Sequence, residues 1–317
     1  MLTFRLKYIA KNIGLDRDLS IQANDSMTIE LRRISDAGLD KRGSRGDLLC
    51  TAELRKEPTR NISEWLQSPT KSLPDGFTEF ADHAHHTLAE AITKTLQLLR
   101  WRTGHRSTRD PIKMSSSFEW STNNGTWVPV AASIEADMHF GIPQLKLTQE
   151  IVASVQDLWR NNVAEPLAHE LFQEAWSQRE DNPKSSLVIG IAAAETGVKQ
   201  LISKLVPSSA WLVQNTQSPP LERILREYLP SLPTRVRNKN APLPPLPESL
   251  VATIIKAVLL RNEIVHGKEV HLEVKSLRVI LSAVHDLLYI FDVYAGQLWS
   301  VDCITVKTRE AWLKTET

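Results

Sequence analysis

The spacing of apolar residues changes once along the 317-residue chain, and this change limits the folds open to it. Up to about residue 140, apolar side chains return at every second position in short runs, which is the period of a half-buried strand. From about residue 147 they return every three or four positions, as in amphipathic helices. This order predicts an α+β N-terminal domain over residues 1–144, followed by an all-α helical bundle over residues 145–296 and a C-terminal tail over residues 297–317.

Alternating apolar positions locate the strands of the N-terminal domain. Strands are expected at residues 2–8, 27–31, 48–54, 118–120 and 128–134. Asn123, Asn124 and Gly125 lie between the last two, and Asn and Gly accept the positive φ of a tight hairpin turn. One long helix is expected over residues 77–102, between the two groups of strands.

Helical spacing locates the bundle. Helices are expected at residues 151–159, 167–176, 183–206, 221–229, 250–266 and 270–294, with Pro166 breaking the first from the second. Short helices with wide apolar stripes indicate an antiparallel bundle. Residues 207–247 hold nine of the 17 prolines and a basic run at 235–239. They are predicted to form a long, extended, Pro-rich insertion.

Composition restricts the class of protein. The net charge of +1 excludes a strongly basic protein of the histone kind but leaves room for a local basic patch. With only Cys50 and Cys303, neither a disulfide framework nor a cysteine zinc site is expected. The chain shows no signal-peptide core and no apolar stretch of membrane-spanning length. We therefore expect a cytoplasmic protein that does not associate with membranes.

The six residues Arg261-Asn262-Glu263-Ile264-Val265-His266 end the helix expected at 250–266, and Gly267 follows as a stop signal. A guanidinium, an amide and an imidazole are thereby placed at one helix end. An imidazole transfers protons near neutral pH, and an arginine binds phosphate oxygens through two parallel hydrogen bonds. This combination suits cleavage of a phosphodiester without a metal, so no metal or cofactor is expected.

Helical geometry divides these polar residues between two faces. At about 100° per residue, Asn262 and His266 fall on the apolar stripe that packs inward, while Arg261 falls on the neighbouring face. The stripe comprises Val251, Ile255, Val258 and Leu259, and the neighbouring face comprises Leu250, Ile254 and Ala257. Polar groups that pack inward need partners, from another helix or from a second copy of the chain. Alternatively, Asn262 and His266 only cap the local backbone.

Glu195 lies within the apolar stripe of the helix expected at 183–206. A carboxylate on an apolar face requires a cationic or hydrogen-bonding partner. Arg261 from the facing helix is the candidate. The alternative is that Glu195 makes only a salt bridge in the core.

Together these features resemble the HEPN superfamily (higher eukaryotes and prokaryotes nucleotide-binding domain). Its signature is similar to Arg261, a polar residue, three further residues and His266 at the end of the penultimate helix of a small bundle. Residues 192–202, AAAETGVKQLI, are similar to an earlier helix of these domains, in which an acidic residue often occurs. The resemblance covers about residues 147–296, and the insertion at 207–247 departs from compact members.

The resemblance implies a metal-independent endoribonuclease that acts as a homodimer through the bundle, in the role of a toxin or antiviral-defence effector. Carried over to this chain, Arg261 would stabilise the pentacoordinate phosphate, His266 would transfer the proton of the ribose 2′-hydroxyl, and Asn262 would orient the pair, with Glu195 in the same site. RNA is the implied partner, and a regulatory partner protein is compatible with the N-terminal domain. The alternative is a non-catalytic HEPN-like dimerisation or interaction module.

Three further groups of residues carry weaker expectations. Glu79, His83, His86 and Glu90 share one helix face that could bind a divalent metal, but a solvated polar face is the favoured interpretation. A basic and aromatic group could bind nucleic acid, although an ordinary helix C-terminus is favoured. It comprises Arg100, Trp101, Arg102, His105, Arg106 and Arg109. His139 and His169 show no partner in the sequence, so packing or surface positions are expected for them.

Overall fold

The computed structural model describes most of the chain and divides it into two compact units. The described residues are 1–10, 14–15, 17–33, 48–68, 72–106, 113–122, 125–130, 144–145, 147–217, 219–232 and 245–313. The first unit is Met1–Leu99 with Asp110–Ala164, and the second is Arg100–Arg109 with Glu165–Thr317. An antiparallel sheet with helices is followed by a mostly helical region, in agreement with the fold class expected from the apolar spacing.

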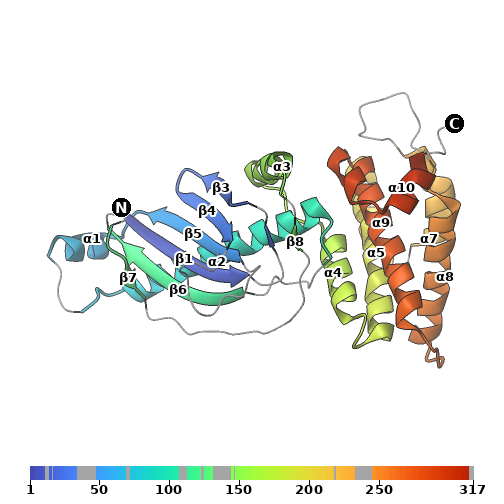
Figure 1. Ribbon diagram of the computed structural model, residues 1–317, viewed down its shortest axis with the longest axis horizontal. Helices are drawn as coiled ribbons and strands as arrows, with labels where there is room; N and C mark the ends of the chain where they lie inside the picture. The colour runs from blue at the N-terminus through green and yellow to red at the C-terminus, as the bar shows by residue number, and fades with distance from the viewer. Residues whose placement is uncertain are drawn as a thin grey trace. The chain divides into compact units, whose positions relative to one another are not determined.

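The first unit is built on a six-stranded antiparallel sheet (Figure 1). Its order is β3 (Leu19–Asn24), β4 (Met27–Arg33), β5 (Leu48–Lys56), β1 (Leu2–Ala10), β6 (Lys113–Ser121) and β7 (Val128–Pro129). A separate parallel pair joins β2 (Gly14–Leu15) to β8 (Gln144–Leu145). The expected strands are present except beyond Pro129, where residues 131–143 lie outside the described part, as do Asn123 and Asn124 of the expected turn. Strand β3 was not predicted.

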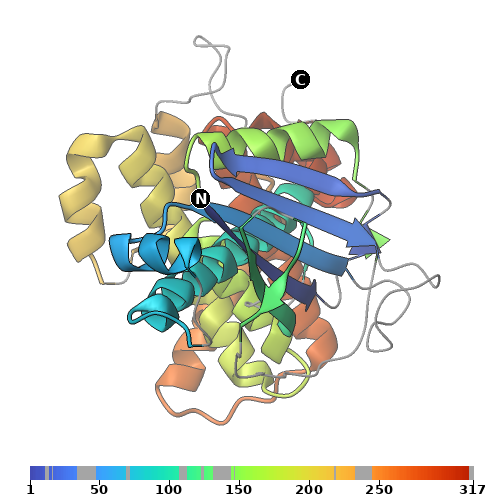
Figure 2. The same ribbon diagram turned by 90° about the vertical axis from the view of Figure 1, so that its left-hand side faces the viewer.

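The apolar face of the sheet packs on helix α2 (Phe77–Thr103), which passes behind the strands in Figure 2. The alternating residues of β1 are buried on this face, as the period-2 spacing requires. Phe4 of β1 lies opposite Leu54 of β5 and Trp120 of β6, and its ring is 5.7 Å from that of Phe80 on α2. Helix α1 (Arg60–Gln67) adds Trp65, whose ring is 6.1 Å from that of Trp120.

Helix α3 (Gln149–Arg160) belongs to the first unit and not to the bundle. The Gln156 side chain both accepts from the Gln22 N–H at 3.1 Å and donates to the Gln22 carbonyl at 2.8 Å, which joins α3 to strand β3. Trp159 Nε1 donates to Thr95 Oγ1 of α2 at 3.0 Å. Consequently the units divide after Ala164 and not at the boundary of 144/145 expected from the period change.

Four helices form the core of the second unit, and Figure 1 shows three of them, α5, α8 and α9, side by side. The four are α4 (Leu167–Gln178), α5 (Pro183–Leu205), α8 (Glu248–Val265) and α9 (Val274–Tyr294). Residues 283–294 of α9 are all buried. The expected tail is also helical, with η4 (Leu298–Cys303) and α10 (Val306–Leu313), and buried Trp312 packs on Tyr294 at 5.8 Å.

The extended insertion predicted at 207–247 is wrong for residues 207–217, which are largely helical, whereas the helix expected at 221–229 is present. Residues 207–231 form η1 (Pro207–Ser209), α6 (Ala210–Asn215), α7 (Leu221–Arg223), the π-helical η2 (Ile224–Tyr228) and η3 (Leu229–Ser231). Leu221, Leu225 and Leu229 are buried at helical spacing. The prolines do not prevent this because Pro207 and Pro220 stand at the starts of helical turns, where a missing N–H costs nothing. Residues 233–244, with the basic run, lie outside the described residues.

The last turn of α2 lies among the buried residues of the second unit. Arg100 and Glu165 form an ion pair in which both side chains are fully buried, and Arg100 Nε donates to Glu165 Oε1 at 3.1 Å. Burial raises the pKa of the Glu165 carboxyl, and the charge and hydrogen bonds of Arg100 oppose that rise. Arg100, Trp101 and Arg102 are therefore core residues and not a surface for nucleic acid, while Arg109 lies outside the described residues. None of the described helices is long and apolar enough to cross a membrane.

Replacing Glu165 by glutamine should destabilise the protein strongly, because it leaves the Arg100 guanidinium charged and buried without its counter-ion. A loss of about 3–5 kcal/mol in the free energy of unfolding is expected, measured as a lower urea midpoint. Glu64→Gln is the matched control, since Glu64 pairs with Arg60 on the exposed face of α1 and should change the midpoint by about 0.5 kcal/mol or less. Equal midpoints for both variants would contradict a role for the buried pair.

Candidate functional site

The C-terminal end of α8 carries three of the four residues singled out in the sequence, Arg261, Asn262 and the C-cap residue His266, and α5 carries the fourth, Glu195. The helix buries Leu250, Val251, Ile254 and Ala257, and it contacts α5 and α9. Arg261 continues this buried side one turn further on, with its side chain 17% exposed. Asn262 is half-buried and His266 is exposed.

The expectation that Asn262 and His266 share the inward-packing face is therefore wrong for His266, which is exposed, while Asn262 is half-buried. Toward the C-terminal end of α8 the face they were assigned to turns outward, since Leu259 is 60% exposed and Ile255 and Val258 are only half-buried, although Val251 near the start of the helix is buried. Because α8 is apolar on both faces, the spacing alone could not decide which one packs on the neighbouring helices. The polar residue turned toward the bundle is Arg261.

The ion pair expected between Arg261 and Glu195 is present. One terminal nitrogen of the guanidinium donates to Glu195 Oε1 of α5, and the Glu195 side chain is 16% exposed. Arg261 Nε is buried and has no hydrogen-bond partner among the described residues. A guanidinium has five N–H donors in a rigid fork, so Glu195 fixes this cation in place and leaves donors for a second oxygen ligand.

His266 is the C-cap residue of α8. Its N–H donates to the Asn262 carbonyl at 3.0 Å, and Gly267 follows with φ +80°, a conformation that favours glycine. Lys268 N–H then donates to the Glu263 carbonyl at 2.9 Å. The main chain thus supplies the cap, in line with the capping alternative, while the imidazole stays exposed at the surface.

Of the four predicted site residues, the structure brings Arg261 and Glu195 into contact. Asn262 and His266 follow on the last turn and the cap of the same helix, with no side-chain bond to that pair among the residues described. A half-buried, anchored cation and an exposed proton carrier are therefore five residues apart on one helix end.

On the polar face of α2, where four side chains were considered as metal ligands, one contact between two of them is present. His86 Nε2 lies 3.2 Å from Glu90 Oε1, and both side chains are exposed. Within the part of the chain that the structure describes, no three His, Cys, Asp or Glu side chains gather in a way that could hold a metal ion.

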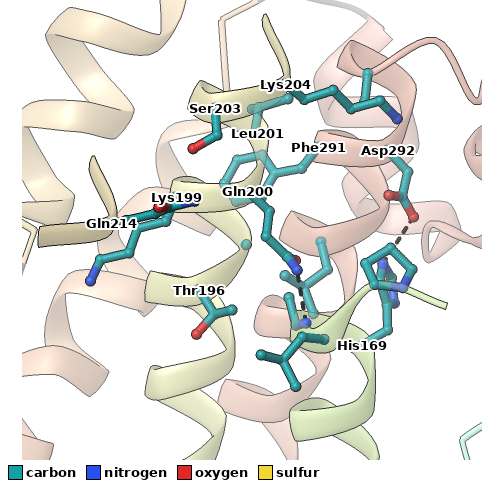
Figure 3. A pocket seen from close by; sticks show the side chains of 16 residues that line it. His169, Thr196, Lys199, Gln200, Leu201, Ser203, Lys204, Gln214, Phe291 and Asp292 are labelled. Carbon is teal, nitrogen blue, oxygen red and sulfur yellow. Dashed lines mark hydrogen bonds and ion pairs between the residues drawn. The ribbon is translucent and has the colours of Figure 1, made fainter. Parts of the chain in front are cut away.

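A cavity of about 660 Å³ in the second unit was not anticipated (Figure 3). Segments of α4, α5, α6 and α9 line it. His169, which seemed to lack a partner, is paired here with Asp292, its Nε2 lying 2.9 Å from Asp292 Oδ2. His139 lies outside the described residues. In the sequence, His169 and Asp292 appear only as single polar residues, each within the apolar stripe of a helix. Their pairing depends on how the two helices pack, which the spacing does not show.

No protein-family model, curated protein or solved structure matches this chain. The resemblance to HEPN domains therefore depends on Arg261, His266 and their helical setting.

Replacing Glu195 by glutamine should reduce stability moderately, because the half-buried Arg261 loses its counter-ion. A loss of about 1–3 kcal/mol is expected from leaving a partly buried donor unsatisfied, measured by urea unfolding. Glu263→Gln, three residues before the cap, removes only a surface pair with Lys268 and should change stability by less than about 1 kcal/mol. If Glu195→Gln unfolds like the control, Glu195 does not anchor Arg261.

Proposed function

We propose that the protein is a metal-independent endoribonuclease of the HEPN type, acting as a homodimer through its helical bundle, with the role of a toxin or antiviral-defence effector. The observation that supports this most is the arrangement at the end of α8, where Glu195 anchors the Arg261 guanidinium and the His266 imidazole is exposed. This end of the helix is accessible within the protomer, as a polynucleotide substrate requires.

The reaction would be an attack of the ribose 2′-oxygen on the adjacent phosphorus. His266 takes the 2′-hydroxyl proton, the new O2′–P bond forms, and the bond to the 5′-oxygen breaks. That oxygen leaves with a proton from an imidazolium, which in a homodimer is His266 of either copy. Arg261 stabilises the charge on the pentacoordinate phosphate through the donors that Glu195 leaves unused, and the products are a 2′,3′-cyclic phosphate and a 5′-hydroxyl.

Exposed apolar side chains beside the motif support the homodimer. Leu259 and Val265, at the end of α8 that carries the motif, are each about three-fifths exposed. Large aliphatic side chains next to a polar functional group are typical of a surface that a partner covers. A second copy of the chain, bound by a two-fold axis near this surface, would place the Arg261 and His266 residues of both copies in one groove.

Purified protein incubated with total RNA in EDTA tests the activity. Arg261→Ala and His266→Ala should each lower the cleavage rate by about 10²-fold or more, because each removes a group that acts in the transition state. His271→Ala is the matched control, since His271 is an exposed histidine five residues beyond His266 and has no proposed role. The cleaved ends should carry the cyclic phosphate. Cleavage that persists unchanged in both variants would remove these residues from the mechanism.

A charged residue introduced into the apolar surface of α8 tests the homodimer separately. Leu259→Glu should convert the dimer to a monomer in light scattering and reduce cleavage, because the apolar contact becomes a buried, unpaired carboxylate. Leu73→Glu, at a similarly exposed leucine in the first unit, should leave both the mass and the activity unchanged. A wild-type protein that is monomeric at micromolar concentration would contradict the dimer.

The second candidate function is a non-catalytic interaction module. It is favoured by the completeness of the Arg261–Glu195 pair within one protomer, which can serve to fix α8 against α5. On this view wild-type protein leaves RNA intact, and Arg261→Ala lowers the unfolding midpoint because Glu195 loses its counter-ion. On the nuclease view cleavage falls far more than stability does.

A further inference from the structure

The cavity of about 660 Å³ among α4, α5, α6 and α9 is separate from the end of α8, since none of its lining residues comes from α8. We propose that it binds a small organic anion with an apolar body. This inference does not depend on the nuclease activity. The volume falls in the range of cavities that hold small-molecule ligands.

One part of the lining is apolar and is set by a close approach of two helices. A Cβ at Gly197 of α5 would lie 2.5 Å from Leu288 Cδ2 and 3.3 Å from Phe291 Cδ2, so only glycine lets α9 pack this near. Leu288 and Phe291 therefore line the cavity together with Leu167 and Leu201. Such a surface favours a hydrocarbon or aromatic ligand body over a fully hydrated ion.

Positive charge enters the cavity from α5. Lys199 and Lys204 both line it, and Figure 3 shows their side chains extending from the same helix. The Lys199 ammonium donates to the main-chain carbonyls of Thr216 and Gln217. These acceptors are neutral, so they hold the ammonium beside the cavity without cancelling its charge.

Among the described residues of the lining the one carboxylate, that of Asp292, already has two partners. Its Oδ2 accepts from Trp101 Nε1 at 2.8 Å and lies 2.9 Å from His169 Nε2, the contact dashed in Figure 3. The N-terminus of α4 borders the cavity at Pro166 and Leu167, and the C-terminal turns of α5 and α9 border it at Lys204 and Asp292, so the helix dipoles favour neither charge. Two lysine side chains against one engaged carboxylate favour an anionic ligand over a cationic one.

Neutral donors complete the site. Gln200 Oε1 accepts from the Ala168 N–H at 3.3 Å, which orients the amide and leaves its NH₂ group as a donor (Figure 3). The lining also contains the hydroxyl groups of Thr196 and Ser203 and a second amide, that of Gln214. Hydroxyl and amide donors bind carboxylate and phosphate oxygens alike, so the ligand class is an amphipathic carboxylate or phosphate monoester.

Isothermal titration of the full-length protein with octanoate and with phenyl phosphate tests the site and distinguishes the two head groups. At least one should bind saturably, whereas acetate, which lacks the apolar body, and octan-1-ol, which lacks the charge, should bind at least about tenfold more weakly. Lys204→Met should weaken the anion at least about tenfold, since a charge-assisted contact is lost. Lys184→Met is the matched control, an exposed lysine of the same helix outside the lining, and should bind like wild type.

Thr196→Phe provides a second variant, because it fills the cavity from its half-buried wall and should abolish binding while the melting temperature is kept. Arg261→Ala should bind the anion normally, which separates this site from the nuclease proposal. The inference is overturned if neither anion binds, if octan-1-ol binds as well as octanoate, or if the Lys204 and Lys184 variants bind alike.

Discussion

The second unit depends on a charge pair that no water reaches, Arg100 with Glu165. Removing either partner would leave the other charge buried without this counter-ion, which is costly. The pair therefore fixes the last turn of α2 within the second unit. Trp101, the next residue, then donates to Asp292 of α9, and its carbonyl accepts from Tyr289 at 2.8 Å. Through these contacts α9 is positioned for α5, the helix that carries Glu195 and receives Arg261.

Local spacing was enough to locate most elements of the fold. Strands β1, β4 and β5 and helices α2, α5, α8 and α9 were predicted within a few residues of their bounds, because side chains on one face recur at the period of the element. The burial of Arg100 could not be predicted, since it depends on Glu165, 65 residues away. The helical turns at 207–215 were missed for another reason, because the prolines of this stretch were taken as a sign of extended chain.

The ion pair of the candidate site could be predicted from the sequence, but the direction in which the His266 side chain faces could not. A carboxylate in the middle of an apolar stripe demands a cation, and this reasoning identified Arg261 as the partner of Glu195. The predicted inward position of the His266 side chain was wrong because α8 has two apolar faces, and only contacts with the neighbouring helices determine which one is buried. The cavity lined by His169 and Asp292 is formed by residues from four helices, so it could not be predicted from any single stretch of the sequence.

The second unit is discontinuous, with residues 100–109 drawn from the midst of the first. A fragment that starts at residue 145 would retain Glu165 and Asp292 but would lack Arg100 and Trp101, their buried partners. During synthesis on the ribosome, the segment with Arg100 emerges early and must wait for α4 and α9 before it can be enclosed. Exchanging residues 145–317 for another domain would therefore separate both buried pairs.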